Sequence, residues 1–213
     1  MRWAGRLGLL LAAAVTALAG DAHLFFSRTF PGSTPPYLEV RLTQAGDAEY
    51  REAPDDELPL KFKLSVEETA AVFALVEKVD YFRHPLESPL KVAFMGTKLM
   101  RYEGGEGKDA VKGEVKFNYS EDQSAQALVN WFEQMAESAS LHIDLERTAK
   151  YDHLGVMHVL EMLAAAMDDH RVVGAAQFLP LLDRVANNEI YMHTARALAG
   201  DLAGAIRNPT PKK

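Results

Sequence analysis

The chain contains no cysteine among its 213 residues. This absence excludes disulfide bonds, cysteine-ligated zinc, iron–sulfur clusters, thiol nucleophiles and a lipid anchor carried by a cysteine. The fold must therefore be stabilised by the burial of apolar side chains. The chain is long enough to form one hydrophobic core or two smaller ones without covalent cross-links.

Long apolar runs are also scarce. The longest extends from Leu7 to Ala19 and follows two arginines. It is shorter than the roughly 20 residues needed to span a bilayer, and it ends in the small-x-small pattern that signal peptidases accept. We therefore expect residues 1–19 to be a signal peptide that is removed after Ala19, with an uncleaved anchor helix as the alternative. This interpretation predicts an extracytoplasmic protein, either periplasmic or secreted.

Basic residues are in the minority. The predicted signal peptide contains two of the 23 lysines and arginines and no acidic residue, so the remainder has 21 basic against 30 acidic residues, a net charge of −9. An acidic protein repels the phosphate backbone of nucleic acids, and no basic stripe with interleaved aromatic residues is present. We therefore expect the partner to be an unknown protein or a small ligand and not a nucleic acid.

Apolar and polar residues alternate through the first half of the mature chain, which predicts half-buried strands. Leu38, Val40 and Leu42 show this pattern most clearly, because each is followed by a polar residue. The predicted strands cover residues 23–28, 38–42, 48–52 and 60–64, and the two arms of a long hairpin, 91–103 and 111–119.

Two capping boxes predict the starts of helices. Glu68 stands three residues after Ser65, and Gln123 three residues after Ser120, which is the spacing at which side chains satisfy the first backbone amides of a helix. Apolar residues then recur at helical spacing. The two predicted stripes comprise Val66, Ala70, Phe73, Val76 and Val79, and Ala125, Leu128, Phe132, Met135 and Ala139.

The chain changes character near residue 120. From there to residue 207 the pattern is helical, with breaks predicted near residues 152–155, 172–174 and 187–188. Strands first and helices later are typical of the α+β class. We expect an antiparallel sheet with packed helices over residues 20–120, a helical region over 121–207 that is either continuous with that core or separate from it, and a frayed tail at 208–213.

Candidate catalytic residues are few. No nucleophile elbow of the Gly-x-Ser-x-Gly type and no His-Glu-x-x-His zinc helix occurs. Ser65 and Ser120 are better explained as helix caps than as nucleophiles. A hydrolase without a recognisable local motif is therefore an alternative, and no residue is assigned a catalytic role.

Metal ligation is the other alternative. His158 and Glu161 are three residues apart and would share a helix face, either as metal ligands or as a hydrogen-bonded surface pair. Met157, Met162, Met167 and His170 suggest copper binding, because thioethers and imidazole suit Cu(I). Met157, Met162 and Met167, however, are five residues apart, which places successive side chains about 140° apart around a helix. These methionines fit core packing better, and no metal-ligating or cofactor-binding residue is assigned.

Other motifs have simple structural explanations. The charged cluster at residues 168–171 fits a helix C-terminus, and Glu189 with His193 fits a solvated helix face. The glycine-rich tip at residues 104–107 joins two predicted strands, so it is interpreted as a hairpin loop and not as a phosphate cradle. Asn118, which opens a glycosylation sequon, stands at the end of a predicted strand.

One short motif resembles a known family. Phe30-Pro31-Gly32 is followed by Pro36-Tyr37, an alternating strand, a Gly-Asp turn and a second strand with Tyr50. This arrangement resembles the opening of a family of small uncharacterised exported bacterial domains, and residues 178–184 are similar to part of other uncharacterised secreted proteins. The resemblance implies a strand-rich domain with a packed helix in a bacterial envelope protein, and no particular activity. Cysteines usually flank the glycine segment in that family, so a paired-cysteine role does not extend to this chain.

The sequence thus supplies core and capping signals but no converging reactive groups. Function resides in sites and not in folds, so this pattern favours a binding surface over catalysis. We expect a non-catalytic exported binding or interaction module, with a hydrolase and a His/Met metal-binding protein as the alternatives.

Overall fold

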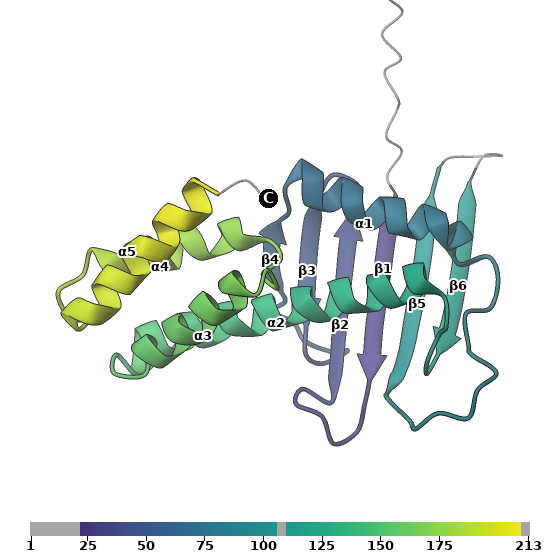
Figure 1. Cartoon of the computed structure of the whole chain (residues 1–213), viewed down its shortest axis with the longest axis horizontal. Coiled ribbons are helices and arrows are strands. Elements are labelled where there is room, and N and C mark those ends of the chain that lie inside the picture. Colours follow the sequence, from purple (N-terminus) through teal and green to yellow (C-terminus); the bar gives the residue numbers. More distant parts are fainter. Residues whose placement is uncertain (1–21, 106–109, 210–213) are drawn as a thin grey trace, which may run out of the picture.

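The computed structural model describes residues 22–105 and 110–209 (Figure 1). It contains a six-stranded antiparallel sheet followed mainly by helices, so the predicted α+β class is confirmed. The predicted signal peptide, residues 1–19, lies outside the described residues. None of the helices in the described ranges is both long and apolar enough to cross a membrane.

The sheet has the strand order β4-β3-β2-β1-β5-β6, and each neighbouring pair is antiparallel. β1 therefore lies between β2 and β5, although β5 follows in the chain only after three more strands and a helix. This central position lets side chains from both sides meet those of β1. The strands are β1 (His23–Thr29), β2 (Tyr37–Thr43), β3 (Asp47–Arg51), β4 (Leu60–Lys63), β5 (Thr97–Gly104) and β6 (Val111–Phe117).

The first arm of the predicted hairpin was too long. β5 begins at Thr97, and residues 91–96 have no regular structure, with Val92, Phe94 and Met95 exposed. Pattern alone does not distinguish a short apolar loop of this kind from a buried strand. Gly96 ends the irregular segment with φ of 90°, a conformation that glycine adopts without steric cost.

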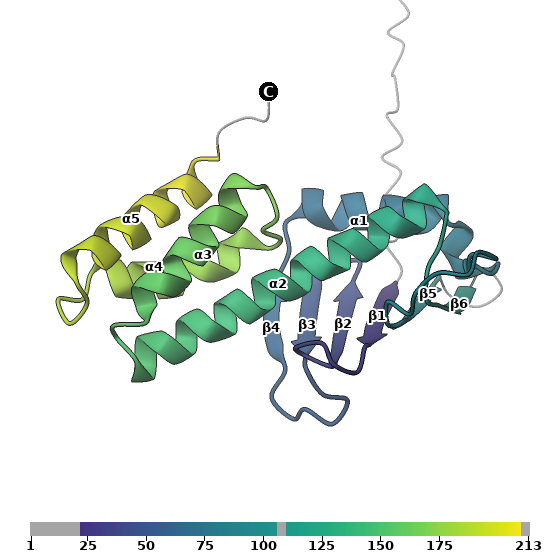
Figure 2. The same cartoon turned by 60° about the horizontal axis from the view of Figure 1, so that its bottom comes forward.

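One helix and a short 3-10 turn follow the first four strands, and the remaining helical elements follow the hairpin of β5 and β6. α1 and α2 pack on the same face of the sheet, while α3, α4 and α5 assemble around the far end of α2 (Figures 1 and 2). They are α1 (Val66–Lys78), η1 (Asp80–Phe82), α2 (Gln123–Tyr151), α3 (Val156–Asp168), η3 (Ala175–Phe178), α4 (Leu179–Ala186) and α5 (His193–Arg207).

The capping box that begins α1 is confirmed. The Ser65 hydroxyl accepts a hydrogen bond from the Glu68 amide at 3.1 Å, and the Glu68 carboxylate accepts one from the Ser65 amide at 2.9 Å. The predicted stripe of α1 is confirmed at Val76 and Val79, which are buried, but it was wrong at Val66, which is 80% exposed. Thr69 takes a core position instead, since its hydroxyl donates to the Ser65 carbonyl oxygen and leaves no unsatisfied donor. The buried face consists of Thr69, Val72 and Val76.

The predicted cap of α2 was also wrong. Asp122, and not Ser120, is the N-cap, and its carboxylate accepts a hydrogen bond from the Ala125 amide at 2.8 Å. Aspartate and serine cap equally well, so the position of the helix start decided between them. The predicted apolar stripe of α2 is confirmed, because all of its members are buried: Ala125, Leu128, Phe132, Met135 and Ala139.

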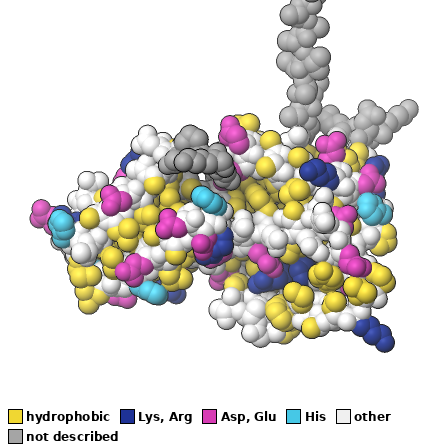
Figure 3. All heavy atoms as spheres, viewed as in Figure 1, with side chains coloured by type: hydrophobic (Ala, Val, Ile, Leu, Met, Phe, Trp, Pro, Cys, Tyr) yellow, Lys and Arg dark blue, Asp and Glu magenta, His cyan; other side chains and the backbone are white. Residues whose placement is uncertain are grey.

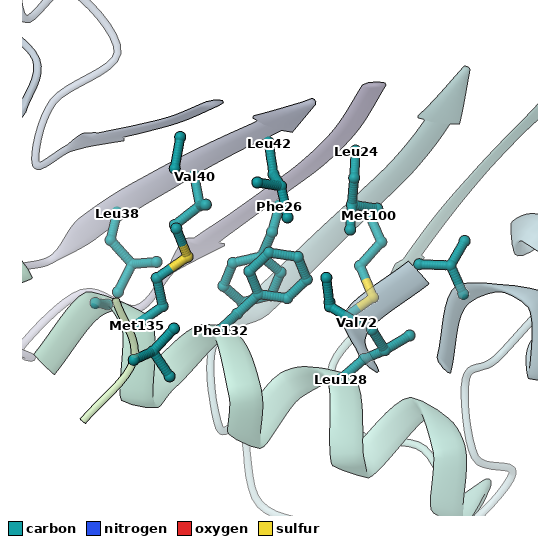
Figure 4. Packing of buried hydrophobic residues seen from close by; sticks show 14 of the residues in the cluster. Leu24, Phe26, Leu38, Val40, Leu42, Val72, Met100, Leu128, Phe132 and Met135 are labelled. Atoms are coloured by element: carbon teal, nitrogen blue, oxygen red, sulfur yellow. The ribbon is translucent and has the colours of Figure 1, made fainter. Parts of the chain in front are cut away.

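α2 contributes to two hydrophobic clusters. Its first half packs on the sheet, where the ring of Phe132 stacks on that of Phe26 with centroids 4.5 Å apart (Figure 4). Its second half supplies Leu141, Leu145 and Ala149 to a separate cluster formed with α3, α4 and α5. One continuous helix therefore connects the sheet to the helical end of the molecule (Figure 2).

The predicted helix breaks are confirmed near residues 152–155, 172–174 and 187–188. The second of these connections is hydrogen-bonded to both sheet-covering helices. The Val173 amide donates to the Ser138 hydroxyl of α2 at 2.9 Å, and the Gly174 amide donates to the Glu68 carboxylate of α1 at 2.7 Å. These contacts hold the helical end against the edge of the sheet.

A left-handed turn follows α1. Asp80, Tyr81 and Phe82 have φ values of 50°, 53° and 62°, which is a rare and strained conformation for three successive residues with side chains. Gly113 of β6 lies directly beneath, where a Cβ atom would be 2.0 Å from the Tyr81 carbonyl oxygen. The absence of a side chain at Gly113 is what allows this turn to pack on the sheet.

Candidate functional site

The sheet has one covered and one uncovered face. α1 and α2 bury Leu24, Phe26 and Met100 on the covered face (Figure 4). Among the described residues, no helix lies over the opposite face (Figures 1 and 2). We call this opposite side the open face.

Strand register brings a line of side chains together across the open face. In an antiparallel pair, residues directly opposite each other point to the same side of the sheet. Phe25 of β1 is opposite Arg41 of β2 and opposite Arg101 of β5. The complete line from β4 to β6 is Lys61, Glu49, Arg41, Phe25, Arg101 and Glu114.

The two arginines at the centre of this line both contact the same aromatic ring. The guanidinium carbon of Arg41 lies 5.9 Å from the ring centroid of Phe25, and that of Arg101 lies 5.2 Å from it. Distances below about 6 Å allow a favourable cation–π interaction. We call these three residues the Arg-Phe-Arg cluster.

Acidic neighbours orient both arginines. Arg41 donates through Nε to Glu39 at 2.7 Å, and Arg101 donates through Nε to Glu114 at 2.6 Å. Glu39 is only 4% exposed and also accepts a hydrogen bond from the Tyr37 hydroxyl at 2.6 Å. Burial, together with this hydrogen bond to a carboxylate, raises the pKa of Tyr37 to about 12. Tyr37 therefore stays a hydrogen-bond donor at neutral pH, and the Glu39 carboxylate that it binds also orients Arg41.

A shallow hollow of about 500 Å³ lies over the cluster. Its floor is formed by β1, β2 and β5, and its rim is polar. Besides the Arg-Phe-Arg cluster, its lining includes His23, Thr43, Asp47, Glu49 and Glu103.

The open face differs in charge from the rest of the molecule. It holds seven basic and five acidic residues, a net charge of +2, whereas all described residues together hold 18 basic and 27 acidic residues. The basic residues of the open face are Arg41, Arg51, Lys61, Lys63, Arg101, Lys112 and Lys116. The acidic ones are Glu39, Asp47, Glu49, Glu103 and Glu114.

The residues considered for metal binding do not converge in the described part of the chain. His158 and Glu161 are both exposed on α3, and no hydrogen bond joins them, so the predicted surface pair is not formed. Met157 and Met167 pack against the helical cluster, while Met162 is exposed. Within the described residues, no group of three or more acidic or histidine side chains is placed to hold a metal ion.

The other motifs have structural roles. Asn118 accepts a hydrogen bond from the Met95 amide at 2.6 Å and donates one to the Ala93 carbonyl oxygen at 3.0 Å, so it fixes the irregular segment before β5. Arg171 forms ion pairs with Glu137 and Asp169.

A Ser-x-x-Lys spacing, formed by Ser88 and Lys91, was missed in the sequence. Some acylating enzymes place such a pair on a helix. Here the segment is irregular, and the Ser88 hydroxyl donates to Glu121 at 2.9 Å, which leaves the two side chains without the geometry of a nucleophile and its base.

No family model matches this chain, and no curated protein matches it either.

Proposed function

We propose that this chain is an exported, non-catalytic binding protein whose open face holds an acidic segment of a partner protein. The observation that carries this proposal is the Arg-Phe-Arg cluster, in which guanidinium groups from two strands lie against one aromatic ring at the centre of an uncovered sheet. The predicted signal peptide and the resemblance to exported bacterial domains support the extracytoplasmic part of the proposal.

The geometry of the arginines favours carboxylates as their ligands. A guanidinium group presents paired donors that match the two oxygens of a carboxylate. Arg41 uses Nε for Glu39, and its terminal nitrogens make no hydrogen bond with any described residue. These nitrogens are therefore available to a carboxylate of a partner.

The arrangement disfavours sugars and nucleic-acid bases. Both kinds of ligand usually stack on a free aromatic face. Phe25 has guanidinium groups over its ring from both neighbouring strands, so this face is already occupied. The ring instead supports the two cations, whose positive charge contrasts with the acidic remainder of the surface.

An oligoglutamate peptide is the probe that tests this proposal, with oligoglutamine as the matched neutral peptide. We expect calorimetry at low ionic strength to show binding of oligoglutamate alone, because exposed charge pairs are screened by salt. Replacing Arg41 by glutamine should weaken binding about tenfold, since its terminal nitrogens are the available donors and a charged hydrogen bond contributes roughly 1.5–3 kcal/mol. Arg184→Gln, an exposed change on α4, is the control.

Two outcomes would contradict the proposed function. Oligoglutamine that binds as tightly as oligoglutamate would remove the electrostatic basis of the site. Equal affinity of the Arg41→Gln and Arg184→Gln variants would place the binding elsewhere. Export is tested separately by mass spectrometry of protein from the extracytoplasmic fraction of its host, where we expect an N-terminus at Gly20.

A further inference from the structure

The connection between η1 and β5 leaves a group of apolar side chains exposed to solvent. It comprises residues 83–96 and has no regular structure. Connections longer than about 12 residues without regular structure are uncommon in compact domains, and they are usually functional or disordered. Four of its side chains are at least 39% exposed, and we call them the apolar loop: Leu90, Val92, Phe94 and Met95.

A hydrogen-bond network holds the end of this connection in one conformation. The Asn118 side chain accepts from the Met95 amide and donates to the Ala93 carbonyl oxygen. The Lys98 ammonium group donates to the carbonyl oxygens of Met95 at 3.2 Å, Gly96 at 3.4 Å and Asn118 at 2.8 Å. Lys98 is only 6% exposed, and a buried charge is unfavourable unless it is hydrogen-bonded. The buried ammonium group thus orders the backbone of the loop.

This ordered backbone leaves the apolar loop on the surface. Phe94 remains 55% exposed although its ring makes an edge contact with that of Phe30, with centroids 5.8 Å apart. Figure 3 shows hydrophobic side chains gathered at the lower right, where Figure 1 places the connection before β5. Because the backbone is already ordered, binding through these side chains costs little conformational entropy. Exposed apolar patches with polar rims are typical of sites that contact proteins or membranes.

Charge and backbone structure narrow the choice of partner. The described part of the chain holds 18 basic and 27 acidic residues, so two copies of it repel each other. A peptide that adds a further strand needs a strand edge, and residues 91–96 form no strand. A zwitterionic lipid surface carries no net charge, and it takes up apolar side chains without any backbone pairing. Lipid is therefore the partner that these features favour.

We infer that the apolar loop docks this protein onto the surface of a zwitterionic membrane. Its four side chains enter the boundary between headgroups and acyl chains, roughly 5–10 Å deep, as the apolar faces of interfacial helices do. Lys91 is exposed between Leu90 and Val92. Its methylene groups lie along the apolar side chains while its ammonium group reaches a lipid phosphate.

This surface is separate from the Arg-Phe-Arg cluster. The apolar loop precedes Thr97, the first residue of β5, whereas Arg101 lies in the middle of that strand. The inference therefore does not depend on the proposed function. A protein that binds no oligoglutamate could still dock to lipid, and the reverse also holds.

Phosphatidylcholine vesicles are the probe, and the chain that begins at Gly20 is the form to use. This form retains every described residue and lacks the apolar run at residues 7–19, which would itself bind lipid. We expect it to cosediment with the vesicles at physiological ionic strength. Phe94→Ser should lower the partition coefficient about fivefold or more, because it removes apolar area that enters the lipid. Leu154→Ser is the matched control, since Leu154 is 75% exposed between α2 and α3, and it should leave partitioning unchanged.

Nuclear magnetic resonance of the unmodified protein decides the question if Phe94→Ser disturbs the loop. A spin-labelled lipid in phosphatidylcholine bicelles should broaden the signals of Val92 and Met95 and spare that of Leu154. Absence of vesicle binding, equal loss of binding in the two variants, or broadening at Leu154 but not at Val92 would overturn the inference. Self-association without lipid that Phe94→Ser abolishes would also overturn it, because the loop would then be covered by a second copy of the chain.

Discussion

Phe26 of β1 and Phe132 of α2 stack with their ring planes 5° apart, and both side chains are completely buried. This contact lies where the central strand meets the longest helix, so it connects the sheet to the element that continues into the helical end. Neither residue is near the other in sequence. Their contact is therefore a direct consequence of the tertiary fold and a suitable place to measure its stability.

Removing the Phe132 ring should destabilise the protein strongly. We expect Phe132→Ala to lower the free energy of unfolding by about 3–5 kcal/mol, because it removes a buried ring and leaves a cavity against Phe26. Urea unfolding followed by circular dichroism measures this change. Val66→Ala is the control, since Val66 is exposed at the start of α1 and its loss should cost less than about 0.5 kcal/mol. Similar costs for the two variants would contradict the described packing.

The close approach at Gly113 gives a second prediction. Gly113→Ala should be destabilising, because the new Cβ atom would collide with the Tyr81 carbonyl oxygen and displace the left-handed turn. A matched control exists in α5, where a Cβ atom at Gly200 would meet no atom within 4 Å. Gly200→Ala should stabilise the protein by about 0.5–1 kcal/mol, because alanine is the better helix former. The prediction fails if both substitutions move the thermal midpoint upwards.

Ser138 tests the connection between the sheet and the helical end. Its hydroxyl accepts a hydrogen bond from the buried Val173 amide at 2.9 Å and donates one to the Gln134 carbonyl oxygen at 2.9 Å. Ser138→Ala should cost about 1–3 kcal/mol, since the Val173 amide loses its acceptor. Hydrogen exchange at Val173 should accelerate together with this loss. Ser124→Ala, in the first turn of α2, is the control, and an unchanged exchange rate at Val173 would contradict the assigned role.

Sequence reasoning succeeded where the signal is local and periodic. The apolar stripe of α2 and the capping box of Ser65 depend on residues within a few helical turns, and both were predicted correctly. The cap of α2 was misplaced because Ser120 and Asp122 are chemically equivalent as caps, and the helix start depends on where β6 ends. Only the start of the α1 stripe was misread, because Thr69 takes the buried position there in place of Val66 and satisfies its hydroxyl within the helix.

The Arg-Phe-Arg cluster was not predictable in the same way. The Arg-Phe-Arg cluster requires β1 to pair with β5, a strand distant in sequence, and no periodicity specifies that pairing. An alternating strand indicates which residues share a face, but strand order decides which residues meet across it. The sequence did contain a signal, because basic residues alternate with core residues along these strands. Which of these basic residues meet on the sheet depends on the strand order.

The hydrogen bond between Tyr37 and Glu39 predicts a loss of stability at alkaline pH. An exposed tyrosine in the unfolded chain has a pKa of about 10, whereas burial and the neighbouring Glu39 raise the pKa of Tyr37 to about 12 in the folded protein. Between these values the unfolded state releases the proton more readily than the folded state, so stability falls as the pH rises. Below about pH 10 the contribution is fully present.

Comparison with Tyr37→Phe isolates this effect, because phenylalanine keeps the ring and has no proton to lose. We expect the free energy of unfolding to fall more steeply between about pH 10 and 12 in the unmodified protein than in the variant. The phenolate absorbance of the unmodified protein should also contain one late-titrating tyrosine that the variant lacks. Parallel stability curves would show that Tyr37 titrates like an exposed residue. In that case Glu39 would not hold Tyr37 in its protonated form, and the preorientation of Arg41 on the open face would lose one of its supports.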